Sequence, residues 1–210
     1  MFLLKIIPYA LLMLIVLEAH AQNVTNPFKV LKSKKEIVYG FDNRRTNIYE
    51  HHTVIYGVYS GVGFGKKLRF KIGISGTPFE VGKFIDSNGD MKKNRLLFVN
   101  LGEEFDFFQY HKIGLTTYLQ AGVGQNYYRI INANGTSVYK GKELIIPIET
   151  GLHFSYDFFT YLKLRAGWGW RFVAPFNSRN LNGYYIKLGL SFSLKKFNES
   201  ITKKMATSRQ

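Results

Sequence analysis

The sequence predicts an all-β protein, an eight-stranded antiparallel up-and-down transmembrane β-barrel preceded by a cleaved signal peptide. Three observations support this fold class. The chain of 210 residues suffices for one domain, and 46% hydrophobic and 16% aromatic residues are too many for a disordered basic chain. Apolar and polar residues alternate along eight segments. The connections between these segments alternate between short and long.

The N-terminus has the pattern of a secretory signal. Lys5 precedes an apolar run over residues 6–17, and Ala19-His20-Ala21 forms a small-residue cleavage site. The run has about a dozen apolar residues, whereas a membrane-spanning helix needs roughly 20. We therefore expect a signal peptide over 1–21 and a periplasmic N-terminal segment over 22–35. Export argues against a nucleic-acid partner, in spite of the formal charge of +15.

Eight segments alternate with a period of two residues, which places apolar side chains on one face and polar or small ones on the other. Strands of this length, tilted by roughly 40°, span the ~25 Å apolar band of a membrane barrel. The predicted strands are 36–42, 54–64, 68–75, 97–107, 113–124, 144–156, 162–172 and 184–194.

The connections set the predicted topology. Three are short, at 65–67, 110–112 and 157–159, and four are long, at 43–52, 80–94, 131–142 and 174–182. Both termini then lie on the side of the short turns, which predicts a barrel over 36–197 and a basic C-terminal tail over 198–210. A soluble sandwich or lipocalin-like barrel with its apolar face inward is the alternative. The many glycines on the polar face favour the membrane barrel.

Four motifs resemble those of a family of small, functionally uncharacterised outer-membrane β-barrel proteins of Bacteroidetes. They are the segments 39–45, 61–76 with Lys66 and Lys67, 122–128 and 164–172. The resemblance implies the outer membrane of a Gram-negative bacterium, with both termini in the periplasm, and it implies no activity. Barrels of this kind commonly end on an aromatic residue that the assembly machinery reads, whereas here Phe197 is followed by the tail.

The polar face of the predicted strands carries charges of both signs. The interior of an eight-stranded barrel is just wide enough for side chains, so these charges are expected to pair across a plugged lumen. This expectation argues against a porin. The predicted lumen network consists of Arg69, Lys71, Glu104, Asp106, Glu149, Lys163, Arg165, Arg171 and Lys187.

One strand carries the components of a hydrolase triad, because Glu149, His153 and Ser155 share a face. The His-x-Ser order is similar to that of lipid A 3-O-deacylases, which are also eight-stranded barrels. Their site faces the membrane, however, whereas these three residues face inward. We therefore regard a catalytic role as the weaker interpretation and a lumen histidine bonded to a neighbouring carboxylate as the stronger one.

Positive charge gathers in or beside two predicted long connections. Guanidinium and ammonium groups bind phosphates and carboxylates, so these residues are candidate contacts for surface glycolipid, unless they only solubilise the rim. The candidates are Arg44, Arg45, Lys92, Lys93 and Arg95. The chain has no cysteine, and His51-His52 lacks a third ligand nearby, so we expect no metal and no cofactor.

Taken together, these features favour a monomeric outer-membrane barrel with a structural, surface-interaction or envelope-scaffold role. Its expected partners are outer-membrane lipid, lipopolysaccharide and the outer-membrane assembly machinery. Two alternatives stay open: an esterase similar to the lipid A deacylases, and an accessory barrel of a secretion or gliding machine.

Overall fold

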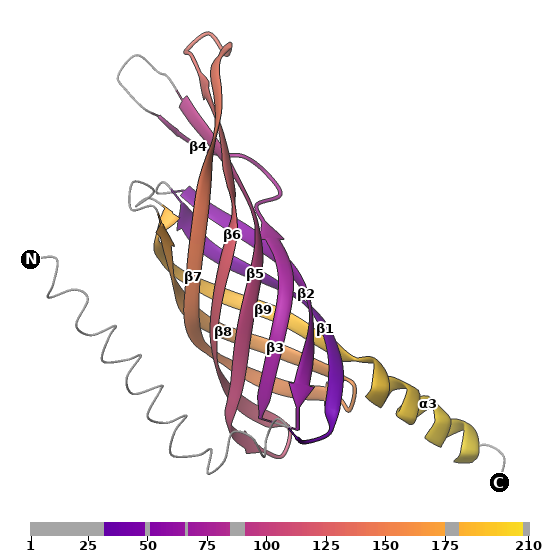
Figure 1. The fold of residues 1–210 in the computed structure, drawn as a ribbon. Coiled ribbons are helices and arrows are strands. Elements are labelled where there is room, and N and C mark those ends of the chain that lie inside the picture. Colours follow the sequence, from indigo (N-terminus) through magenta and orange to yellow (C-terminus); the bar gives the residue numbers. More distant parts are fainter. Residues whose placement is uncertain (1–31, 49–50, 66, 85–90, 175–180, 208–210) are drawn as a thin grey trace, which may run out of the picture.

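The computed structural model describes residues 32–48, 51–65, 67–84, 91–174 and 181–207 (Figure 1). The predicted signal peptide lies outside the described residues. The described elements are β1 (Lys35–Ile48), β2 (His51–Phe64), β3 (Leu68–Gly76), β4 (Val81–Phe84), β5 (Met91–Tyr110), β6 (Ile113–Ile131), β7 (Ser137–Phe159), β8 (Leu162–Ala174), β9 (Gly183–Ser193) and helix α3 (Leu194–Thr207).

The strand segments form one closed antiparallel ring. Consecutive segments pair with one another except for β3 and β4, which both pair with β5, and β1 pairs with β9. Between β3 and β4, Thr77 and Leu96 exchange two hydrogen bonds of 3.0 Å, so β4 continues β3 along the same neighbour. The nine segments thus fill eight positions, and the pairing of β3 with β5 closes the ring, whereas β4 pairs with β5 alone. The predicted eight-stranded up-and-down barrel is confirmed.

The exposure of the side chains shows which face of the barrel wall is apolar. Outward-pointing side chains such as Ile72, Leu101 and Trp168 are 56%, 63% and 53% exposed. Inward-pointing Glu104 and Glu149 are 0% and 1% exposed. An apolar exterior around a polar interior is the arrangement of a transmembrane barrel and the reverse of a soluble one.

Several strands run further than the hydrophobic pattern predicts. Ile48 pairs directly with His51, so most of the predicted connection at 43–52 belongs to β1 and β2. Likewise β5 starts at Met91 and β7 at Ser137, inside the predicted connections at 80–94 and 131–142. Backbone hydrogen bonding continues past the apolar band. The side chains there are polar, so the local sequence resembles that of a loop. Figure 1 shows the upper parts of β5, β6 and β7 projecting beyond the rest of the barrel. We call residues 91–95, 127–131 and 137–142 the β5–β7 extension.

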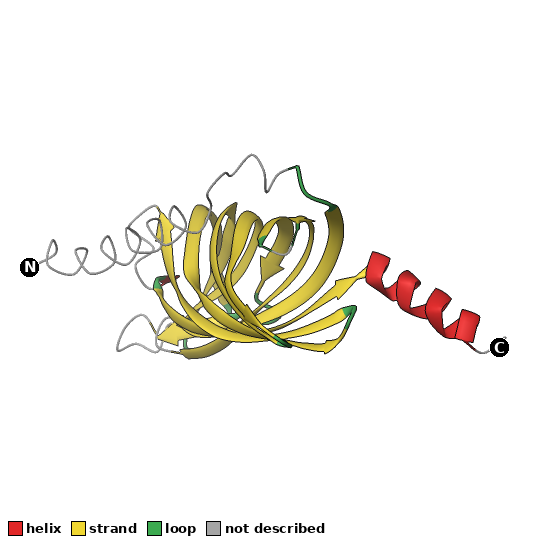
Figure 2. Ribbon diagram, turned by 90° about the horizontal axis from the view of Figure 1, so that it is seen from below, coloured by secondary structure: helices red, strands yellow, loops and turns green. Residues whose placement is uncertain are grey.

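The C-terminal tail is a helix that begins earlier than the predicted tail. β9 ends at Ser193 and α3 begins at Leu194, so Phe197 is helical and not the last strand residue. The Ser193 hydroxyl accepts a 3.3 Å hydrogen bond from the Lys196 amide and caps the helix. Figure 2 shows α3 projecting outward from the barrel wall. The helix that the structure describes is not long and apolar enough to cross a membrane.

Candidate functional site

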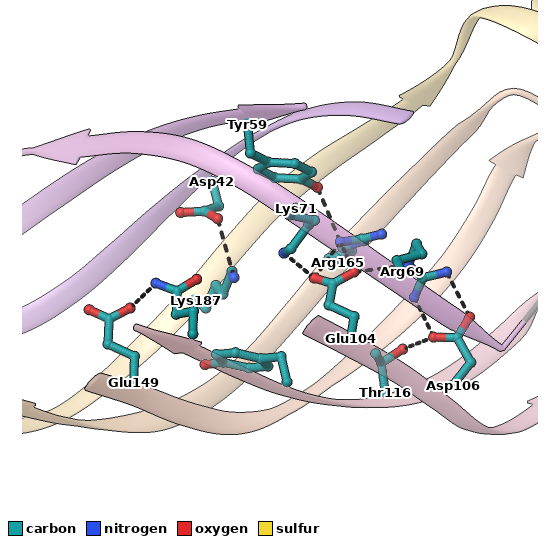
Figure 3. A network of polar contacts seen from close by, with 12 residues as sticks. Asp42, Tyr59, Arg69, Lys71, Glu104, Asp106, Thr116, Glu149, Arg165 and Lys187 are labelled. Carbon is teal, nitrogen blue, oxygen red and sulfur yellow. Dashed lines mark hydrogen bonds and ion pairs between the residues drawn. The ribbon is translucent and has the colours of Figure 1, made fainter. Parts of the chain in front are cut away.

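The lumen holds two clusters of charge, each built around a glutamate. Glu104 on β5 accepts hydrogen bonds of 2.9 Å from Arg69 Nε and from Arg165 Nη1, and it also pairs with Lys71 (Figure 3). Arg69 makes a two-pronged contact with Asp106 as well. Three cations from β3 and β8 therefore converge on a single buried carboxylate.

The second cluster surrounds Glu149 on β7. This carboxylate accepts hydrogen bonds from Arg44 Nη1 at 2.8 Å and from Arg171 Nε at 2.6 Å. Arg44 also bonds to Asp42, which in turn pairs with Lys187 at 3.2 Å. These five side chains come from β1, β7, β8 and β9, so the cluster ties distant strands of the wall across the lumen. Such pairing offsets the large cost of removing the charges from water.

Two tyrosines lie in the lumen beside these clusters. The hydroxyl of Tyr118 donates a 2.7 Å hydrogen bond to that of Tyr185. Gly151 and Gly169 give them space, since a Cβ at either position would lie 2.7 or 2.5 Å from the Tyr118 oxygen. Glycine on the inward face thus serves close packing in a narrow interior.

The structure places the predicted network residues on the inward face, and all but one of them are exposed by 9% or less. Lys163 is the exception, because it is partly exposed and pairs with Asp157 at 3.3 Å. Asp42 and Arg44 also belong to the network, although they were not predicted to lie in the lumen. Their position two residues apart on one strand, alternating with outward Phe41, is the signal that could have identified them.

The three residues of the suggested triad lie in the lumen but form no triad. Glu149 bonds to Arg44, Arg171 and Gln120 instead of a histidine. Both ring nitrogens of buried His153 lack a hydrogen-bond partner among the described residues, so His153 does not bond to a carboxylate either. Its ring lies 5.6 Å from that of Tyr118. Without a bond from the base to Ser155, this geometry provides no activated nucleophile.

An apolar cluster lies in the lumen above the charges. It consists of inward-pointing residues at the end of the barrel opposite the tight turns, and each is at most 9% exposed. Its members are Ile48, Ile55, Val81, Leu96, Phe98, Ile145, Val173 and Leu181. We call this cluster the apolar cap. The local sequence does not distinguish these residues from lipid-facing ones, and apolar residues were expected only on the outer face.

The outward face of the β5–β7 extension carries cations in register. Lys93 pairs with Arg129, which pairs with Lys140, so three cations lie side by side across three strands. In the adjacent row, Arg95 pairs with Tyr127, which pairs with Lys142. The next outward position on β5 is apolar Leu97, where the lipid-facing surface begins. We call these two rows the cationic rows.

A cleft of about 560 Å³ lies against the cationic rows. Arg95, Arg129 and Lys140 line it together with Tyr127, and Glu80 is the one carboxylate among its described lining residues. Glu80 pairs with Arg129 through hydrogen bonds of 2.9 and 2.5 Å. Like charges directly opposite one another destabilise a sheet, so an anion bound here would relieve an unfavourable arrangement. The cleft has the charge and the open face of an anion-binding site.

The predicted glycolipid contacts separate into four locations. Lys93 and Arg95 lie in the cationic rows, and Arg45 points outward from β1. Arg44 instead points into the lumen and is 2% exposed, because it alternates with Arg45 along a strand. Lys92 faces away from the rows, 4.1 Å from the Tyr128 ring. Arg129, Lys140 and Lys142 were missed, since nothing in their local sequence shows that they lie beside Lys93 and Arg95.

Comparisons with known proteins support the fold. No protein-family model and no curated protein matches the sequence. A major outer membrane protein from Thermus thermophilus is similar in structure, with a TM-score of 0.54 at 7% identity over 77% of this chain and 100% of that one. The N-terminal β-barrel domain of Pseudomonas aeruginosa OprF gives a TM-score of 0.49 at 13% identity over 77% and 100%. At 7% identity, the similarity to the Thermus thermophilus protein concerns the fold alone.

Proposed function

We propose that this protein is a non-conducting barrel of the bacterial outer membrane that binds the phosphates of outer-leaflet glycolipid through its cationic rows. The single observation that carries the proposal is the row of Lys93, Arg129 and Lys140, three directly neighbouring cations on an outward, lipid-side face. A surface with this charge just above the apolar band meets the headgroups of the surrounding lipid. Lipopolysaccharide, whose headgroup is anionic, fits this surface by charge.

The lumen supports a role without transport. The apolar cap packs buried apolar side chains at one end, and the clusters around Glu104 and Glu149 place paired side chains in the interior. An apolar constriction over a salt-bridged interior opposes the passage of hydrated ions. The same proposal includes export through a signal peptide. It also includes an orientation in which the tight turns face the periplasm. This orientation places the β5–β7 extension outside the cell.

The test uses full-length protein refolded in a neutral detergent and fluorescently labelled lipopolysaccharide, with binding followed by anisotropy. In the test variant, Lys93, Arg95 and Lys140 are each replaced by glutamine. Each cation near an anionic surface contributes about 1 kcal/mol, so the triple variant should bind about a hundredfold more weakly. Arg129 is left unchanged because its ion pair with Glu80 stabilises the extension.

The matched control removes three exposed lysines at the opposite end, through Lys35→Gln, Lys67→Gln and Lys112→Gln. It should bind labelled lipopolysaccharide like the unmodified protein. Dephosphorylated lipopolysaccharide should bind equally poorly to all three proteins. Equal losses in the test and control variants would show that net charge alone attracts the glycolipid, and the proposed site would be rejected.

A further inference from the structure

Helix α3 has one apolar stripe and an opposite basic face. Leu194, Phe197 and Ile201 recur at spacings of three and four, which places them on one side of the helix, and Met205 continues the spacing. Lys195 and Lys196 are exposed away from this stripe. Over its length the helix contains four lysines and one glutamate. This distribution is typical of a helix that lies at a membrane surface.

The apolar stripe continues the lipid-facing surface of the barrel. The Phe197 ring lies 5.1 Å from that of Tyr161 and 5.4 Å from that of Phe192. Tyr161 stacks in turn on Phe159, at 5.4 Å, and Phe159 is 49% exposed on the outside of the barrel. Aromatic side chains of this kind mark the boundary between acyl chains and headgroups. The helix therefore starts at that boundary.

The start of the helix is held in place by polar contacts. Lys196 Nζ lies 3.1 Å from Glu36 Oε2 on β1, and its amide is capped by Ser193. From this anchored start α3 leads away from the wall rather than across the barrel opening, as the view from below shows (Figure 2). The helix therefore does not close the lumen. At its start, Leu194 of the stripe is 45% exposed and Phe197 contacts the outer aromatic residues of the wall.

We propose that α3 lies in the headgroup region of the leaflet at the tight-turn end, where it binds anionic phospholipid. Its stripe would insert among the acyl chains and its lysines would contact the phosphates. In this position the apolar side chains leave water and the positive charges lie beside negative ones. Continuity with the aromatic boundary favours lipid over a cell-wall polymer, which would leave the apolar stripe in water. The inference goes beyond the proposed function and does not depend on the cationic rows.

The absence of cysteine from the sequence makes a direct test possible. Full-length Ile201→Cys and Glu199→Cys variants carry a polarity-sensitive fluorophore on the stripe or on the opposite face. In nanodiscs, which leave both membrane surfaces accessible, acrylamide should quench the label at position 201 at least about threefold less than that at position 199. Equal quenching at the two positions would overturn the proposal. A barrel band that still shifts on heating in SDS gels shows that each variant is folded.

The second measurement tests the headgroup chemistry. Protection at position 201 should increase when phosphatidylglycerol replaces part of the phosphatidylcholine in the nanodisc. The increase should disappear when Lys195→Gln and Lys203→Gln are added, and it should persist in a matched variant with Lys67→Gln and Lys112→Gln. Protection that is independent of lipid charge would refute the anionic-lipid assignment. Protection that requires added peptidoglycan or a partner protein would refute the membrane location itself.

Discussion

The guanidinium of Arg165 lies 2.9 Å from both carboxylate oxygens of Glu104, although the two residues are 61 positions apart in the chain. This bond crosses the lumen from β8 to β5, and Arg69 and Lys71 reach the same carboxylate from β3. Glu104 is thus the shared counter-ion of three buried cations. We therefore expect the barrel to depend on Glu104 more than on an ordinary salt bridge.

We expect Glu104→Gln to destabilise the barrel by about 3–5 kcal/mol, because it leaves buried cations without a counter-charge. Urea unfolding in lipid vesicles, followed by the heat-dependent shift in SDS gels, measures the change. The control is Asp157→Asn, which breaks the partly exposed pair with Lys163 and should cost less than about 1 kcal/mol. Similar losses in the two variants would contradict the role assigned to Glu104.

Adjacent leucines test the apolar cap. Leu96 points inward at 3% exposure, whereas Leu97 points outward at 49%. Leu96→Ala should cost about 2–5 kcal/mol because it leaves a cavity in the cap. Leu97→Ala should cost clearly less, since lipid chains can fill the space. The same urea titration compares them, and an equal or larger loss for Leu97→Ala would show that the cap is not packed as described.

Two glycines test the space required by the lumen tyrosines. A Cβ at Gly169 would lie 2.5 Å from both the Tyr118 hydroxyl and the Thr150 carbonyl oxygen, whereas one at Gly63 would meet no atom closer than 3.4 Å. Gly169→Ala should therefore destabilise the barrel by about 1–3 kcal/mol, and Gly63→Ala should be close to neutral. Refolding yield and urea midpoint provide the measurement. A neutral Gly169→Ala variant would refute the close packing.

His153 provides a test of a buried polar group without partners. Since neither ring nitrogen is hydrogen-bonded among the described residues, His153→Leu should leave stability unchanged or raise it by up to about 2 kcal/mol. Thr116→Val is the contrasting variant, because the Thr116 hydroxyl donates a 2.5 Å bond to Asp106 and its loss should destabilise the protein. A clear loss of stability in His153→Leu would mean that the ring holds a bound group.

The fold could be predicted because its signal is local. In a strand, successive side chains point to opposite faces, so the alternation of residues such as Leu188, Gly189 and Leu190 reveals both the strand and its two faces. The prediction failed where the residues on both faces of a strand are polar. Arg44 and Thr46 were assigned to a connection although β1 continues to Ile48. The ladder of backbone hydrogen bonds that continues the strand does not depend on side-chain polarity.

The candidate site could be predicted only in part. Lys93 and Arg95 were identified from their local charge, but their neighbours Arg129 and Lys140 lie more than 30 positions away along the chain. Leu96 and Phe98 of the apolar cap were missed for the opposite reason, because an apolar residue by itself does not show whether it faces lipid or the lumen.

By itself, therefore, the sequence determined the eight strand positions of the barrel and the separation of each into an apolar and a polar face. Only the tertiary structure decided which face is outside, which cations share Glu104 and which share Glu149, and that cations align in rows on the β5–β7 extension. The reason is that alternation is a property of neighbours along one strand, whereas pairing depends on the register between strands. That register is set by the closure of the whole ring.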